Sequence, residues 1–329
     1  MNYKSILVTG GTGSFGKAFL KYSIKKYKKI KKLVVFSRDE LKQSELQKIY
    51  PISKYPFIRF FIGDIRDKTR LSMALKDIDV VIHAAALKQI ETAEYNPIET
   101  IKTNIIGSQN LVEVALDSKV KNVIALSTDK AVSPANLYGA TKLSAEKLFL
   151  AANNIRGKNK IKFSIVRYGN VMGSRGSVLP IFLNKKLKFF PVTHPEMTRF
   201  NITLEEGVKL VDYVEKNNTG GEIYIPKLKS FHIVELAKAI DIKKKIKVIG
   251  IRKGEKLHEE LINFEESKNS YENKDMYVLY PNTENKDRNR PKINKKFLAT
   301  KKQFSYNSFD NKPYLKSSEL KKLILFTKE

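Results

Sequence analysis

The sequence contains no cysteine and only four histidines among 329 residues. Disulfide bonds and thiolate zinc sites are therefore excluded, and the chain suits a reducing cytoplasm. No apolar run approaches the ~18 residues that a membrane-spanning helix needs, and the first residues show no signal-peptide pattern. His258 has no second histidine four residues away. We therefore expect a cytoplasmic protein with no membrane partner and no metal.

Acidic residues are scarce relative to basic ones. Lys and Arg number 62 against 34 Asp and Glu, which gives a formal net charge of +28. Such a charge can attract nucleic acid, so a non-enzymatic, basic nucleic-acid-binding protein remains a rival hypothesis. The lysines, however, are spread along the chain and do not form a compact stripe with aromatic residues. We favour an anionic small-molecule substrate and no nucleic-acid partner.

Apolar segments alternate with helical patterns through the first half of the chain. Strands are predicted at 5–10, 32–37, 58–64, 79–86, 122–128 and 162–171, and helices at 16–27, 40–50, 69–77, 96–119 and 137–154. This alternation predicts an α/β fold, a doubly wound parallel (Rossmann) sheet with a smaller C-terminal substrate-binding domain.

The predicted division places the dinucleotide-binding domain at 1–168, with contributions from about 200–240, and a mainly substrate-binding region at 169–329. Later elements are expected at 203–216, 222–226, 232–240 and 247–251, with a helix starting near 254. Beyond about 267 the polar sequence predicts an irregular tail that ends in a helix at 317–326.

A glycine-rich segment joins the first predicted strand to the first helix. Gly10, Gly13 and Gly16 have the spacing that allows a tight turn and lets the backbone approach a pyrophosphate at a helix N-terminus. The strand–turn–helix context makes this a specific signal for a dinucleotide. At the end of the second strand, Arg38 suits a 2′-phosphate, whereas Asp39 suits a ribose hydroxyl. We expect NADP, with NAD as the less favoured cofactor.

A second cluster follows the fifth strand. Thr128 ends that strand, and Tyr138 and Lys142 lie one turn apart on the next helix. A lysine ammonium and the cofactor's positive charge would lower the tyrosine pKa from ~10, so that the phenol can take a hydroxyl proton as hydride leaves the carbon. This pair predicts hydride transfer between a dinucleotide and a substrate carbon.

Several segments together resemble the extended short-chain dehydrogenase/reductase superfamily, among them TGGTGSFG, SRDELKQSE, AAALK, STDKA, YGATK and VRYGNVMGSRGSV. More narrowly, with EMTRF and GIRKGEKLHEELI, they resemble the inverting UDP-N-acetylglucosamine 4,6-dehydratases of the pseudaminic acid and capsule pathways. The resemblance covers nearly the whole chain and implies a hydro-lyase. It also implies UDP-N-acetylglucosamine as substrate and a homo-oligomer, either a dimer or a hexamer.

The resemblance assigns roles to the two residues after Thr128 and to Tyr138. Lys130 is the implied base at C5, Asp129 the acid that protonates the departing C6 hydroxyl, and Tyr138 the base at C4. Lys130 must then be partly neutral and Asp129 protonated, so we expect a lowered pKa for the first and a raised pKa for the second. Retaining dehydratases usually carry Asp-Glu at these two positions. The Asp-Lys pair therefore favours inversion at C5.

The remaining predicted contacts come from the same motifs. The candidate cofactor contacts are Gly10, Thr12, Gly13, Ser14, Phe15, Gly16, Ser37, Arg38, Asp39, Glu40, Lys42, Gln43, Asp64, Ile65, Ala84, Ala85, Ala86, Lys88, Thr103, Asn104, Tyr138, Lys142 and Val171. The candidate substrate contacts are Lys88, Asn170, Arg175, Gly176, Ser177, Val178, Thr193, Arg199, Arg252 and Glu255, with Arg175 and Arg252 suited to the diphosphate.

One segment departs from the pattern of these relatives. Residues 90–93 read Ile-Glu-Thr-Ala where relatives often carry a Val-Pro-like sequence, so Glu91 puts the exact sugar in question. A retaining dehydratase or a C4 epimerase of a UDP-sugar therefore stays open, as does a regulator that binds NADPH without catalysis.

Overall fold

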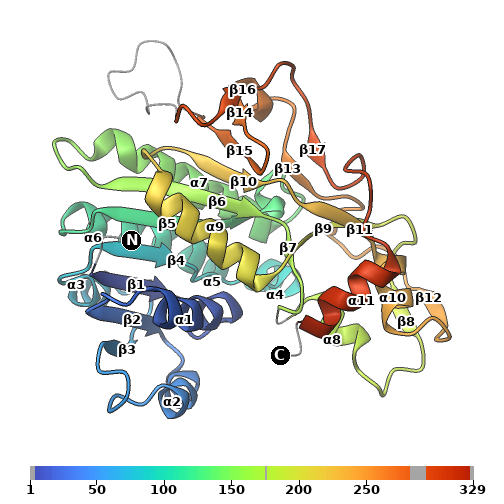
Figure 1. Cartoon of the computed structure of the whole chain (residues 1–329), viewed down its shortest axis with the longest axis horizontal. Coiled ribbons are helices and arrows are strands. Elements are labelled where there is room, and N and C mark those ends of the chain that lie inside the picture. The colour runs from blue at the N-terminus through green and yellow to red at the C-terminus, as the bar shows by residue number, and fades with distance from the viewer. Residues whose placement is uncertain (1–3, 175, 282–293, 327–329) are drawn as a thin grey trace.

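The computed structural model describes residues 4–174, 176–281 and 294–326, and within these ranges a ten-stranded sheet forms the centre of the molecule (Figure 1). Its order is β16-β14-β15-β10-β6-β5-β4-β1-β2-β3. The run from β10 to β3 is parallel. The parallel strands are β1 (Ser5–Thr9), β2 (Lys32–Ser37), β3 (Ile58–Ile62), β4 (Val80–His83), β5 (Asn122–Thr128), β6 (Lys162–Tyr168) and β10 (Ile223–Pro226).

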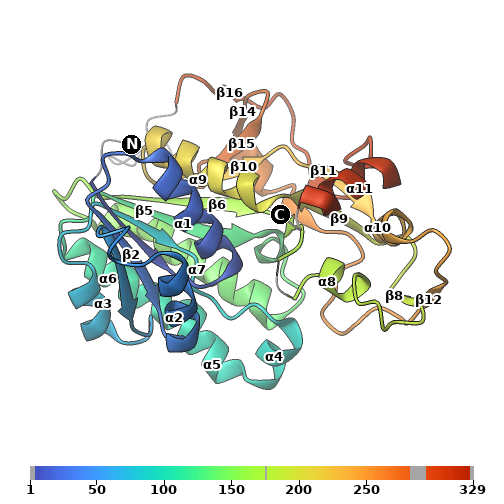
Figure 2. The same cartoon turned by 60° about the horizontal axis from the view of Figure 1, so that its bottom comes forward.

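Helices cover both faces of this sheet, because the strands bury side chains on both sides. Leu7 of β1 belongs to a core with α3 (Lys68–Ala74), α6 (Gly107–Leu116) and α7 (Leu137–Ile155). Ile6 and Val8 point the other way, to α1 (Ser14–Lys26), α2 (Glu40–Ile49) and α9 (Leu204–Asn217). Figure 2 shows α9 above the sheet and α6 below it. The predicted doubly wound α/β fold is confirmed.

The long helix predicted at 96–119 is interrupted. It consists of α5 (Pro97–Ile101), a π-helical turn (Lys102–Ile106) and α6, and a short helix α4 (Ile90–Tyr95) precedes it. Asn104 in the wide turn donates to Leu87 O at 2.9 Å and to Thr141 Oγ1 at 3.0 Å, and accepts from Leu87 N at 2.8 Å. The π-turn, a common feature of functional sites, thus fastens the segment after β4 to α7.

A separate apolar core lies beyond residue 170. It joins α8 (Val178–Phe182), β8 (Phe190–Val192), α10 (Ile233–Ile240) and α11 (Ser317–Phe326). A small sheet of β7 (Asn170–Val171), β9 (Thr198–Ile202) and β11 (Lys229–His232) borders it. Between these pieces the chain returns to the large sheet through α9 and β10. The two regions are therefore interleaved along the chain, and the domain boundary at residue 168 stays a prediction.

Two expectations for the second half are wrong. Residues 250–259 form no helix, because Gly250 and Gly254 adopt left-handed φ values of +87° and +74° that break a helix; β12 (Ile246–Val248) precedes them and β13 (Glu260–Ile262) follows. The tail is also more regular than expected. β14 (Ser270–Glu272), β15 (Met276–Leu279) and β16 (Leu298–Ala299) extend the sheet in antiparallel fashion, and β17 (Tyr306–Asn307) pairs with β13. The final helix is confirmed as α11.

No helix within the described ranges is both long and apolar enough to cross a bilayer.

Candidate active site

The glycine loop leaves the N-terminus of α1 open toward solvent. Gly13 is the N-cap, no side chain caps it, and the first turn carries no acid. By contrast, α2 is capped by Asp39, α3 by Asp67 and α9 by Thr203. An uncapped helix start of this kind suits an anion such as a pyrophosphate. Gly10 packs against the backbone of Ala84 and Ala85, so the glycine loop lies beside the segment that follows β4.

The loop also requires glycine for internal packing. A Cβ on Gly16 would lie 2.4 Å from the carbonyl oxygen of Gly11, so α1 could not start where it does. We expect Gly16→Ala to cost about 1–3 kcal/mol of stability through overpacking and to abolish dinucleotide binding. Gly207→Ala is the matched control, because a Cβ there would meet only Tyr168 at 4.0 Å. Calorimetric titration and thermal unfolding of both variants test this, and intact cofactor binding by Gly16→Ala would contradict it.

The residues after β2 divide into a scaffold and an exposed arginine. Asp39 accepts from the backbone N–H of Lys42 at 3.0 Å and pairs with the Lys42 ammonium. The Gln43 amide donates to the carbonyls of Ser37 at 2.7 Å and Phe61 at 3.2 Å and is buried. The Arg38 side chain is 54% exposed, with Asp64 at 3.6 Å. Asp39 and Gln43 are therefore engaged within the protein, while the guanidinium faces solvent.

Other predicted cofactor contacts differ in accessibility. Thr12 bonds Ser37, with 2.8 Å between their hydroxyl oxygens. Phe15 stacks on Phe19. Ile65 is buried against Gly107. Thr103 carries a buried hydroxyl oxygen with no hydrogen-bond partner. Ser14 begins α1, and Glu40 and Lys42 lie in the first turn of α2; of these three, Glu40 is exposed.

The acid–base cluster gathers where β5 ends. Asp129 is fully buried, and its Oδ1 accepts from Thr128 Oγ1 and from Lys130 Nζ, both at 3.0 Å. Lys130 Nζ lies equally close, 3.0 Å, to Oε1 of Glu259. Tyr138, on α7, shares a hydrogen bond with Thr128. The structure therefore brings together the residues that the sequence predicted, and adds Glu259.

The charges in this cluster do not follow the sequence expectation throughout. Burial raises the pKa of Asp129, against the opposing effect of the Lys130 ammonium, which suits a proton donor. Burial favours the neutral amine of Lys130, but the carboxylates of Asp129 and Glu259 outweigh it and raise the Lys130 pKa. The expected lowering of the Lys130 pKa is wrong, because Asp129 acts together with a second buried carboxylate, Glu259, which the sequence did not disclose.

The tyrosine–lysine pair is also arranged differently. Burial raises the pKa of Tyr138 to about 12, although Lys130 and the Thr128 hydrogen bond act to lower it. Lys142 donates to the backbone carbonyl of Leu126 at 2.8 Å, and burial lowers its own pKa to about 8. The cation that favours Tyr138 ionisation is therefore Lys130 rather than Lys142, and the expected lowering of the Tyr138 pKa by Lys142 is wrong.

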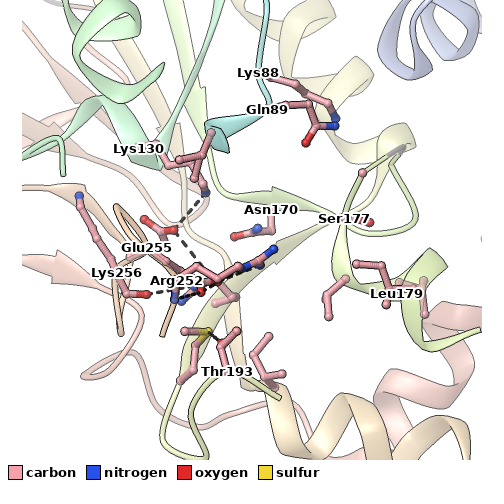
Figure 3. Close-up of a pocket in the computed structure, with 18 of the residues that line it drawn as sticks. Lys88, Gln89, Lys130, Asn170, Ser177, Leu179, Thr193, Arg252, Glu255 and Lys256 are labelled. Atoms are coloured by element: carbon pink, nitrogen blue, oxygen red, sulfur yellow. Dashed lines mark hydrogen bonds and ion pairs between the residues drawn. The ribbon is translucent and has the colours of Figure 1, made fainter. Parts of the chain in front are cut away.

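A pocket of about 370 Å³ opens above the cluster. Figure 3 shows Lys130 on one side of it, Ser177 and Leu179 on the other, and Asn170 between them. The predicted substrate contacts that line it are Lys88, Asn170, Gly176, Ser177, Val178, Thr193, Arg199, Arg252 and Glu255, and Val171, a predicted cofactor contact, lines it as well. Arg175 lies outside the described residues.

The arginines of the pocket have distinct partners. Arg199 is buried and donates to the carbonyls of Thr198, Leu257 and Lys256 at 2.7–3.0 Å, so it holds the segment before β13 in place. Arg252 is 56% exposed at the pocket edge, 3.3 Å from Glu255 and 4.0 Å from Glu91. Glu91, the departure noted in the sequence, thus lies near Arg252, one of the two arginines predicted to contact the diphosphate.

Sequence reasoning missed Glu259 and the tail that supports it. Ser308 donates from its backbone to Glu259 O at 2.8 Å, and its Oγ accepts from Glu259 N at 2.9 Å. Gln89 was also missed: it lines the pocket and lies against Gly176. The only sequence signal for Glu259 is the acidic pair of the GEKLHEE segment in a lysine-rich chain. Among the described residues, no three His, Asp or Glu side chains gather as metal ligands.

Comparison with known proteins agrees with this architecture. A family model described as a polysaccharide biosynthesis protein matches residues 6–281. The chain belongs to this family. A relative from Campylobacter jejuni named UDP-N-acetylglucosamine 4,6-dehydratase (inverting) is 47% identical over 333 residues, which cover 99% of this chain and 98% of the relative. The resemblance stated above is thereby confirmed, and with it the prediction of a hydro-lyase.

Two further comparisons bear on fold and specificity. The X-ray structure of Pen from Bacillus thuringiensis superimposes with a TM-score of 0.88 at 38% identity, covering 98% of this chain and 97% of that one. A Rickettsia bellii relative named UDP-glucose 4-epimerase is 45% identical over 271 residues, 80% of this chain and 79% of the relative. Relatives with these two names are similar to this chain at nearly the same identity, so identity alone does not decide between the two activities.

Proposed function

We propose that the chain is a UDP-N-acetylglucosamine 4,6-dehydratase that inverts C5 and uses bound NADP. The observation that carries the proposal is the contact of Asp129, Lys130, Thr128 and Tyr138 beside a pocket lined by the predicted sugar-nucleotide contacts. A C4 oxidation alone needs only the tyrosine–lysine part of such a cluster. An acid and a base in addition serve the removal of water.

Each residue of the cluster has its own role in the proposed reaction. Thr128 and Tyr138 hold the C4 hydroxyl, and Tyr138 takes its proton. Lys130 takes the proton from C5, which the neighbouring C4 ketone makes acidic. Asp129 protonates the departing C6 hydroxyl, for which its raised pKa suits it. A dinucleotide at the glycine loop Gly10–Gly16 would supply the acceptor for the C4 hydride and the donor of hydride to C6, so no net redox change results. C5 regains a proton from solvent on the opposite face, which inverts it.

Product analysis tests this proposal directly. The protein is incubated with UDP-N-acetylglucosamine in deuterated water, and the product is examined by NMR. We expect a 4-keto-6-deoxy sugar with deuterium at C5 and the L-configuration, UDP-2-acetamido-2,6-dideoxy-β-L-arabino-hex-4-ulose. Such a product would supply pseudaminic acid or related surface-glycan synthesis, with flagellin among the possible acceptors. A product with the D-configuration would indicate a retaining dehydratase.

The epimerase is the second candidate, because a relative at 45% identity carries that name. An epimerase returns hydride to C4 and leaves the C6 hydroxyl in place. A 4-epimer that retains this hydroxyl, without deuterium at C5, would replace dehydration as the function.

The preference for NADP is supported by Arg38. Asp39 already caps α2 and pairs with Lys42, while the Arg38 guanidinium is more than half exposed. Since a charge-assisted hydrogen bond is worth about 1.5–3 kcal/mol, we expect Arg38→Ala to weaken NADP binding by at least about tenfold and to leave NAD binding unchanged. Calorimetric titration with both dinucleotides measures this. Equal weakening for both would contradict a 2′-phosphate contact.

A further inference from the structure

Lys130 bridges two buried carboxyl groups, and the proposed reaction uses only one of them. Its Nζ lies 3.0 Å from Oδ1 of Asp129 and 3.0 Å from Oε1 of Glu259, whose side chains are 0% and 2% exposed. In the part of the chain that the structure describes, these are the carboxylates that form ion pairs with Lys130. Glu259 also lines the substrate pocket.

The reaction imposes a proton count on these three residues. It needs a neutral amine on Lys130 and a proton on Asp129 at the same time. The Lys130 ammonium must therefore lose a proton that Asp129 cannot accept, because the Asp129 proton is reserved for the C6 hydroxyl. Glu259 is the acceptor that remains in direct contact.

We propose that Glu259 is the positioning residue for this proton: when substrate fills the pocket, Lys130 transfers a proton to Glu259 and becomes the free base. The N–H bond of Nζ breaks, an O–H bond forms on Oε1, and no electrons are exchanged. The ammonium–carboxylate pair and the amine–acid pair carry the same net charge. The inference rests on the proposed dehydration, since an epimerase needs no base at C5.

Without substrate, the surroundings favour the ammonium–carboxylate form of the pair. Arg199 of β9 lies 3.8 Å from Glu259, and this cation and Lys130 lower the Glu259 pKa against the effect of burial. Lys256 of the same segment, Asp129, Tyr138 of α7 and Lys88 after β4 are the other titratable groups that act on the cluster. Removal of water by bound substrate makes separated charges more costly and so favours the neutral pair.

The backbone of Glu259 is held in place by Ser308, while one oxygen of its carboxyl group has no partner. Oε2 is buried without a hydrogen-bond partner in the protein. Ser308, itself fully buried, bonds both the N–H and the C=O of Glu259. The carboxyl is therefore held against Lys130 by backbone bonds that do not depend on its own charge.

The test follows deuterium entry at C5 by mass spectrometry in Glu259→Gln, with UDP-N-acetylglucosamine and the NADP-loaded protein. We expect the variant to reduce its cofactor on substrate addition, since C4 oxidation does not require Glu259. We expect C5 exchange near neutral pH to fall about a hundredfold or more. Glu260→Gln is the matched control, because Glu260 accepts from Ser133 and Ser305, away from Lys130, and should stay within about twofold of wild type.

The pH profile separates a proton acceptor from a mere charge partner. A transfer within the pair needs no proton from water, so the wild-type rate should stay flat around neutral pH. In Glu259→Gln, Lys130 must lose its proton to solvent, and the rate should rise about tenfold per pH unit. If Glu259 acts only as a charge that raises the Lys130 pKa, its removal yields more free amine, and exchange at neutral pH would equal or exceed wild type. That result overturns the proposal.

Two further measurements keep the outcomes distinct. Thermal unfolding with NADP bound establishes that the variants are folded. If Glu259→Gln does not fold, Glu259→Asp replaces it: a flat profile with a reduced rate supports the proposal, and a rising profile overturns it. If wild-type protein incorporates no deuterium at C5, the dehydration itself fails. If wild type and Glu259→Gln incorporate it equally, only the role of Glu259 fails.

Discussion

Replacing Lys130 by alanine is expected to abolish dehydration of UDP-N-acetylglucosamine while NADP stays bound. The Nζ of Lys130 lies beside Asp129 and lines the pocket, and no other amine in the described cluster is paired with that acid. Loss of a positioned general base costs about 10²–10⁴-fold in rate, and we expect the upper part of this range. NMR of the product and titration of the dinucleotide measure the two halves of the prediction.

Lys130→Arg is the matched control for this experiment. A guanidinium keeps the positive charge between Asp129 and Glu259, so the fold should be preserved, but it does not give up a proton in proteins. We therefore expect the arginine variant to be as inactive at C5 as the alanine variant. Turnover near wild type in either protein would remove Lys130 from the role of base.

Among the proposed substitutions, Arg167→Ala is expected to lower the free energy of unfolding the most. Arg167 is 0% exposed and bonds both oxygens of Glu146, at 3.0 and 2.6 Å, and both oxygens of Glu266, each at 2.9 Å. It also donates to Leu261 O at 3.0 Å. Removing one partner of such a buried pair strands a charge and costs about 3–5 kcal/mol.

Urea unfolding at constant NADP concentration measures this loss, because bound ligand shifts apparent stability. Lys209→Ala is the control: its pair with Glu205 is 60% and 70% exposed, and such surface pairs contribute about 0–1 kcal/mol. A loss below about 1 kcal/mol for Arg167→Ala would contradict the structural role.

Local patterns predicted the parallel sheet in the first half of the chain well. The strands of the parallel sheet are short, apolar runs buried on both faces. For the run 32–37, the predicted bounds are those of β2. The glycine loop and the Thr128–Lys130 segment occupy strand ends, so their chemistry could be anticipated from their place in the alternation. The placement of Tyr138 and Lys142 on one face of α7 could be predicted because they are one helical turn apart.

Long-range contacts were not accessible in the same way. Glu259 and Ser308 are far from Lys130 in sequence, and no periodicity marks the irregular segments that carry them. The pKa of Lys130 was predicted in the wrong direction, since it depends on Asp129 and also on Glu259, a carboxylate that only the folded chain brings close. The helix expected near 254 is absent for a related reason: in addition to the left-handed Gly250 and Gly254, the distant Arg199 binds backbone carbonyls of this segment.

The clamp from Ser308 to Glu259 has a consequence for how the protein is made. A ribosome synthesises the glycine loop, the parallel strands and the tyrosine–lysine helix long before it reaches residue 308, and folding begins with such early regions. A nascent chain can therefore shape its dinucleotide cradle while the group that receives the Lys130 proton is still unanchored. In the mechanism proposed here, the step at C5 therefore depends on a part of the chain that is synthesised late.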